Sequence, residues 1–192
     1  MSAPDGVSPT DTRVSNVNVA NALTVLRIVL VPVFLVALFA DGGHDPHWRW
    51  IAFIVFAVAM FTDRVDGQIA RRYGLITDFG KLMDPIADKA LTGAALIGLS
   101  MLGDLPWWVT VVILIRELGI TVFRFAVIRD GVIPASRGGK LKTMLQTIAI
   151  GLYLMPLPAW MDLPKAVVLG AAVIVTVWTG IDYLVSWWRA RT

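Results

Sequence analysis

Six apolar segments, each about 20 residues long, constrain the fold of this 192-residue chain more than any other feature. Backbone N–H and C=O groups find no water in lipid, so a crossing segment must be a helix or a strand of a closed barrel. No segment alternates as a barrel strand does. We therefore predict an all-α integral membrane protein with six transmembrane helices. The segments are about Val19–Ala40, Trp48–Ala70, Leu82–Leu102, Pro106–Ile128, Leu141–Met155 and Lys165–Trp188.

The composition agrees with a membrane protein. The chain is 57% hydrophobic and 16% charged, whereas soluble domains are about 45–50% apolar and about 25% charged. The absence of cysteine excludes disulfides, thiolate metal sites and a cysteine nucleophile. The net charge of +3 is modest, and the basic residues lie mostly at segment ends, which indicates membrane topology and no nucleic-acid partner.

The N-terminal residues 1–17 are polar and lack the charged and apolar regions of a signal peptide. We expect a flexible tail there and one transmembrane domain over residues 18–192.

The connections between segments alternate in charge, which predicts the orientation. The connections at 41–47 and 102–106 contain no Lys or Arg, whereas those at 71–81 and 129–142 and the C-terminus do. Because basic residues mark the cytoplasmic side, both termini and the 71–81 connection are predicted to be cytoplasmic. Lys165, in the third outer connection, departs from this pattern.

The charged stretch TDRVDGQIARRYGLITDFGKLMDPIADKA, residues 62–90, lies between two apolar segments. Asp63 and Asp66 are three residues apart and Asp84 and Asp88 four apart, so each pair lies on one face of its helix. Four converging carboxylates repel one another unless a cation lies among them. Oxygen ligands suit hard ions such as Mg²⁺, Mn²⁺ or Ca²⁺, and two such ions would form a phosphoryl-transfer site.

Neighbouring residues fit a phosphate-bearing substrate. Gly67 and Gly80 leave room for a ligand near the backbone, and Arg71 can present a planar fork to a phosphate. The alternative is that the aspartates form interfacial salt bridges with nearby basic residues. These are Arg64, Arg71, Arg72, Lys81 and Lys89.

The pattern Asp63-x2-Asp66-Gly67-x2-Ala70-Arg71-x8-Gly80-x3-Asp84-x3-Asp88 resembles, at every defined position, the signature of the CDP-alcohol phosphatidyltransferases. The resemblance implies a six-helix CDP-alcohol phosphotransferase-like bundle from about residue 16 onward. It also implies displacement of CMP from a CDP-linked lipid by an alcohol, two Mg²⁺ or Mn²⁺ ions, and a homodimer.

The same resemblance implies roles for individual residues. Asp63, Asp66 and Asp84 would be metal ligands. Asp88 would be both a ligand and the base that deprotonates the acceptor hydroxyl. The implied contacts to the CDP-lipid are Gly67, Ala70, Arg71 and Thr77.

Three further stretches, at 18–34, 114–124 and 135–143, resemble the bacterial phosphatidylglycerophosphate synthases. That resemblance implies CDP-diacylglycerol and glycerol 3-phosphate as substrates, and a bacterial plasma membrane location. The residues agree, because five basic groups facing the metal site would form a pocket for an anionic acceptor. They are Arg116, Arg124, Arg137, Lys140 and Lys142.

Some of these basic residues have other interpretations. Arg116 lies within a predicted membrane helix, where a charge needs a partner, and it could pair with Glu117 or an aspartate. Arg137 and Lys142 could simply be charges of the cytoplasmic side.

Asn21, Thr24 and Arg27 recur at a spacing of three in the first segment. The family resemblance suggests that this face lines the nucleotide or acceptor cavity. Helix capping or interhelical hydrogen bonding is the alternative for Asn21 and Thr24.

Two other functions stay open. An inositol phosphate acceptor would need a basic pocket of the same kind. A divalent-cation transporter would use the four aspartates as its transport site, but they cluster at one membrane face with no acidic partner set at mid-depth.

Overall fold

A computed structural model of the chain describes residues 19–73, 78–127 and 137–189. Side chains are described except at 19–21, 63–73, 78–82, 84–85, 124–127 and 137–138. These ranges form six α-helices and two 3-10 turns and contain no strand. The elements are α1 (Val19–Phe39), η1 (Ala40–Gly43), α2 (Pro46–Tyr73), α3 (Asp78–Met101), α4 (Trp107–Val127), α5 (Arg137–Leu154), η3 (Ala159–Met161) and α6 (Asp162–Arg189).

The prediction of an all-α fold is confirmed, and each helix covers one predicted segment. The ends differ most where α3 begins at Asp78 and α5 at Arg137, each before the predicted start, and α2 continues to Tyr73. All four aspartates of the motif therefore lie on helices, two on α2 and two on α3. The predicted tail, residues 1–17, lies outside the described residues, so its separation from the domain stays a prediction.

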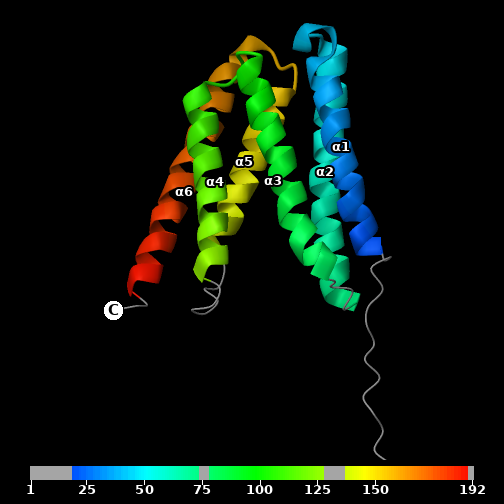
Figure 1. Ribbon diagram of the computed structural model, residues 1–192. Coiled ribbons are helices and arrows are strands. Elements are labelled where there is room, and N and C mark those ends of the chain that lie inside the picture. Colours follow the sequence, from blue (N-terminus) through cyan, green and yellow to red (C-terminus); the bar gives the residue numbers. More distant parts are fainter. Residues whose placement is uncertain (1–18, 74–77, 128–136, 190–192) are drawn as a thin grey trace, which may run out of the picture.

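The helices run alternately up and down (Figure 1). One end of the bundle, here called the α2–α3 end, contains the start of α1, the end of α2, the start of α3 and the end of α6. The other end, the η1 end, contains η1, the connection from α3 to α4, and η3. Every charged residue of the motif therefore belongs to the same end of the molecule.

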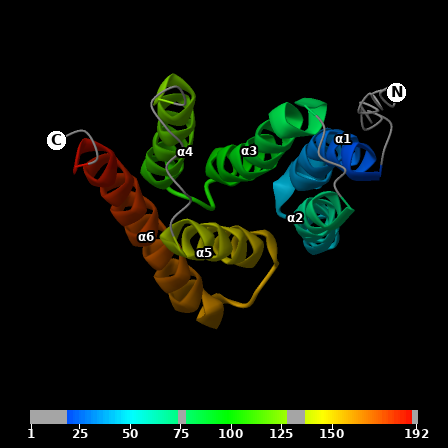
Figure 2. The same cartoon turned by 90° about the horizontal axis from the view of Figure 1, so that it is seen from below.

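The helices form two groups of three when viewed along the bundle (Figure 2). In one group α1 packs extensively against α2 and α3, and in the other α6 packs against α5 and α4. Contacts of α2 with α5, and of α3 with α4 and α5, join the groups. Helix α3 thus stands beside both α4 and α5, and its start lies at the same end of the bundle as the end of α4 and the start of α5.

The first group is held by an apolar core. Phe34 and Leu38 of α1 are buried against Phe56 of α2 and Leu99 of α3. Gly98 allows α1 and α3 to approach closely, since a Cβ atom there would lie 2.5 Å from the Leu38 side chain. The fit of these apolar side chains therefore helps to orient the three helices.

The outer surface is apolar, whereas several polar side chains are buried. Large apolar side chains are exposed on each of helices α1 to α6, for example Val29, Phe61, Met101, Ile115, Met144 and Trp178. Buried polar side chains include Arg27, Arg49, Lys142, Gln146 and Thr176. Two stretches of the described chain, Ala22–Gly43 and Ala159–Arg189, are long and apolar enough to cross a membrane. This distribution is that of a membrane protein.

Candidate active site

A cavity of about 40 Å³ lies between α3, α4 and α5. Its walls carry carboxylate, ammonium, amide and hydroxyl groups inside an otherwise apolar bundle. Ionisable groups gathered inside the bundle of a membrane protein mark a candidate functional site. The polar lining residues are Asp88, Lys89, Thr92, Glu117, Lys142, Thr143, Gln146 and Thr147.

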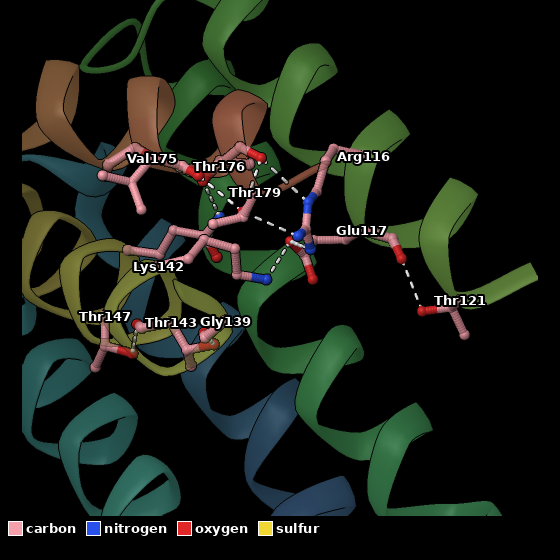
Figure 3. Close-up of polar contacts among 12 residues, drawn as sticks. Arg116, Glu117, Thr121, Gly139, Lys142, Thr143, Thr147, Val175, Thr176 and Thr179 are labelled. Atoms are coloured by element: carbon pink, nitrogen blue, oxygen red, sulfur yellow. Dashed lines mark hydrogen bonds and ion pairs between the residues drawn. The ribbon is translucent and has the colours of Figure 1, made fainter. Parts of the chain in front are cut away.

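Lys142 and Glu117 form a buried ion pair at this cavity. The Lys142 ammonium donates a hydrogen bond to Oε1 of Glu117, and the two side chains are only 7% and 18% exposed. Figure 3 shows the two side chains reaching toward each other from α5 and α4. Burial removes the water that would screen these charges, so each depends on its partner.

Arg116 joins the same carboxylate to α6 (Figure 3). Its Nη1 lies 3.2 Å from Oε1 of Glu117. Its Nε donates to the carbonyl of Thr176 at 3.2 Å, and its Nη2 donates to Oγ1 of Thr179 at 3.0 Å. Gly180 leaves room for this arrangement, because a Cβ atom there would lie 3.2 Å from Cγ of Arg116.

A second bond joins α5 to α6. Nε2 of Gln146 donates to Oγ1 of Thr176 at 2.8 Å, and that hydroxyl donates to the carbonyl of Ala172 at 2.5 Å. We call these bonded side chains the polar network. Its members are Arg116, Glu117, Lys142, Gln146, Thr176 and Thr179.

Of the predicted metal ligands, Asp88 lines the cavity. Asp63 and Asp66 are on α2 and Asp84 is on α3, but their side chains lie outside the described ones. No group of three potential metal ligands occurs among the described side chains. The predicted metal site therefore stays a prediction.

The predicted contacts to the CDP-lipid are only partly described. Thr24 and its neighbour Arg27 are each 1% exposed on α1, within the bundle. The remaining predicted contacts lie outside the described residues or side chains. These are Asn21 on α1, Gly67, Ala70 and Arg71 on α2, and Thr77 between the helices.

The five basic residues predicted to bind the acceptor separate into four kinds. Lys142 lines the cavity with Asp88. Arg116 is bonded to Glu117 and to α6. Pairing with Glu117 is the alternative to acceptor binding that the sequence offered for Arg116. Lys140 is exposed on α5. The side chains of Arg124 on α4 and Arg137 on α5 lie outside the described ones.

Sequence reasoning considered Glu117 only as a partner of Arg116, and it missed Gln146, Thr176 and Thr179. A signal was available. Thr176 and Thr179 are three residues apart in an apolar helix, and Gln146 is an amide in a segment that must exclude water.

A second buried arginine lies at the η1 end. Arg49 forms an ion pair with Asp104, and its Nε donates to the carbonyl of Gly43 at 2.5 Å. Its Nη1 donates to the carbonyl of Tyr153 at 3.3 Å. These bonds join η1, the α3–α4 connection and the end of α5.

Comparison with known proteins agrees with the motif. Residues 17–178 match the family model described as CDP-alcohol phosphatidyltransferase. The chain is 62% identical over 167 residues to a probable phosphatidylglycerophosphate synthase of Mycobacterium tuberculosis, covering 87% of this chain and 80% of the relative.

More distant relatives extend this similarity. One is the CDP-diacylglycerol–glycerol-3-phosphate 3-phosphatidyltransferase of Bacillus subtilis, 38% identical over 90% of this chain and 96% of the relative. The protein of the same name from Rickettsia bellii is 34% identical over 86% of this chain and 93% of the relative.

Proposed function

Because this chain belongs to the CDP-alcohol phosphatidyltransferase family, we propose that it transfers the phosphatidyl group of CDP-diacylglycerol to glycerol 3-phosphate. The products are phosphatidylglycerophosphate and CMP. The observation that carries this proposal is the cavity in which Asp88 of the family motif lies with the buried ammonium of Lys142. A base and a cation there suit an acceptor that has both a hydroxyl and a phosphate. The names of the relatives favour glycerol 3-phosphate over an inositol phosphate.

We place each of helices α1 to α6 across the membrane, with the α2–α3 end in the cytoplasm. The exposed apolar side chains on every one of these helices support the crossing. The basic residues at 71–81 and 129–142 support the orientation. The diphosphate of the lipid then reaches Asp88 from the membrane surface.

The residues fit a site for Mg²⁺ or Mn²⁺. Two neighbouring helices carry four aspartates, at Asp63 and Asp66 on α2 and Asp84 and Asp88 on α3. Carboxylate oxygens are the ligands that these hard ions prefer. Two bound ions would neutralise charge on the diphosphate and on the leaving phosphate oxygen.

The remaining residues bind and orient the substrates. We assign the CDP-lipid to Asn21, Thr24, Gly67, Ala70, Arg71 and Thr77. The acceptor phosphate binds Lys142, with Lys140, Arg124 and Arg137 as further cations and Arg116 supporting the group from the α6 side. We also propose a homodimer, as the family resemblance suggests.

The chemical step is a displacement at the phosphorus nearest the diacylglycerol. The acceptor hydroxyl oxygen forms a bond to this phosphorus, and the bond from phosphorus to the CMP oxygen breaks. Asp88 accepts the proton of the hydroxyl, and CMP leaves with the bonding electrons. A carboxylate base in this position contributes about 10²–10⁴-fold to the rate.

Release of CMP tests the proposal. Purified protein in detergent receives CDP-diacylglycerol and Mg²⁺ or Mn²⁺, with glycerol 3-phosphate, inositol 1-phosphate, inositol or serine as acceptor. We expect release with glycerol 3-phosphate alone, lowered about 10²–10⁴-fold by Asp88→Asn. Release with inositol 1-phosphate instead would overturn the acceptor. No release, together with metal flux across sealed vesicles, would indicate a transporter.

A further inference from the structure

We infer that Glu117 is a positioning residue, which holds the Lys142 ammonium at the wall of the Asp88 cavity and so sets the affinity for a phosphate-bearing acceptor. This inference rests on the proposed function, since it assigns a partner to the cation that binds the acceptor phosphate. Glu117 acts through Lys142 and is not assigned a contact with the reacting atoms.

The first support is the geometry of the carboxylate. A single oxygen, Oε1, accepts from both Lys142 and Arg116. Two cations therefore share one anion, which leaves the group with a net positive charge beside the cavity. Without Glu117 the two cations would face each other in a medium of low dielectric, where like charges repel strongly.

The second support is the way in which Arg116 is held. Its Nε and Nη2 donate to α6, so the guanidinium is fixed against that helix. Arg116 also lines an apolar groove of about 490 Å³ between α4 and α6, whereas the residues lining the Asp88 cavity include Glu117 and Lys142 but not Arg116. Arg116 therefore holds Glu117 from the side of α6. Among Arg116, Glu117 and Lys142, Lys142 is the cation that lines the cavity.

The third support is the burial of Lys142. A lysine side chain has many rotamers, and fixing it costs conformational entropy. The bond to Glu117 supplies a defined position for the ammonium, with two N–H groups left for other acceptors. An acceptor phosphate then meets a cation that is already placed.

Two variants test the inference in the full-length protein. Glu117→Gln keeps an oxygen in place but removes the charge, and Glu117→Ala removes both. A hydrogen bond to a charged group is stronger than one between neutral groups. We therefore expect the KM for glycerol 3-phosphate to rise about 10-fold in Glu117→Gln and about 100-fold in Glu117→Ala. The KM for CDP-diacylglycerol should change less than about twofold in either variant.

A double variant tests whether Glu117 acts through Lys142. In a Lys142→Met background, Glu117→Gln should raise the KM for glycerol 3-phosphate by less than about twofold, because the positioned group is gone. A full 10-fold increase in that background would show independent action and overturn the inference.

Asp104→Asn is the matched control, because it also removes a carboxylate from a buried arginine, but at the η1 end. It should leave the KM for glycerol 3-phosphate unchanged. An equal increase in Asp104→Asn would mean that Glu117 matters only for stability. Unaltered KM in both Glu117 variants would also contradict the inference while leaving the proposed function intact. A wild-type protein that releases no CMP would contradict both.

Discussion

Two buried arginines, Arg49 and Arg116, each pair with a carboxylate, yet the two clusters have different surroundings. Arg49 bonds to Asp104 and to the carbonyls of Gly43 and Tyr153, so it joins the ends of three segments. Arg116 bonds to Glu117 and to α6, and Glu117 continues to Lys142 at a cavity. The first cluster joins chain segments at the η1 end. The second lies at the cavity that Asp88 of the family motif lines.

The difference shows why burial and charge alone do not identify a functional site. Both arginines satisfy the requirement that a charge in the membrane needs a partner. At the η1 end the partners are chiefly backbone carbonyls, which hold the chain. At the other site the carboxylate also pairs with Lys142, which lines the Asp88 cavity, so one bonded group remains directed toward a ligand. We therefore expect loss of the two clusters to affect different measurable quantities.

The largest expected effect on stability comes from the two arginines. Arg116→Met removes the bonds to α6 but leaves Glu117 paired with Lys142, and Arg49→Met leaves Asp104, 25% exposed, to be hydrated. Each substitution should lower the free energy of unfolding by about 1–3 kcal/mol. Thermal unfolding in detergent measures both, and the KM for glycerol 3-phosphate should rise only in Arg116→Met. A raised KM in Arg49→Met would remove the distinction.

The next effect concerns the two lysines that pair with carboxylates. Lys142→Met removes the more deeply buried of the two lysines that line the cavity, Lys89 and Lys142, so kcat/KM for glycerol 3-phosphate should fall about 10²-fold. Lys165→Met is the control, since Lys165 lies 2.8 Å from Asp162 at the η1 end and should leave kcat/KM unchanged. Steady-state CMP release measures both. An equal loss of kcat/KM in both variants would mean that the acceptor does not bind at Lys142.

The smallest effect sharpens the account of Arg116. A Cβ atom in Gly180→Ala would lie 3.2 Å from Cγ and 3.4 Å from Nε of Arg116. Displacing that side chain should lower stability by about 1 kcal/mol. Gly170→Ala, on the same helix, has no atom within 4 Å of the added Cβ and should not destabilise. Thermal unfolding of the two variants measures this difference in stability. An equal loss of stability in both would indicate a general effect on α6 and not a contact with Arg116.

The fold could be predicted from the sequence because the bilayer dictates segment length and excludes other backbone structures. Each apolar segment became a helix. The ends were less predictable, since α5 begins at Arg137 rather than Leu141 and α2 continues past Ala70 to Tyr73. Charged residues can extend a helix beyond the hydrocarbon region, and an apolar pattern does not detect that.

The family was predictable where spacing along one helix carries the information. The aspartate spacing resembles the family signature, and the comparisons show that family, whereas the metal site stays a prediction. The polar network was not predictable, because Glu117, Lys142 and Thr176 are brought together by the packing of three helices. Local periodicity reports which residues share a face and not which helices become neighbours.

The identity of the lipid product tests the central claim most directly. Protein in detergent would receive CDP-diacylglycerol, Mg²⁺ and glycerol 3-phosphate labelled with ¹³C in its glycerol carbons, and the extracted lipids would be analysed by mass spectrometry. The account predicts phosphatidylglycerophosphate containing all of the labelled carbons, formed in equal amount to CMP and nearly absent with Asp88→Asn. CMP formed without any labelled lipid would contradict transfer to glycerol 3-phosphate.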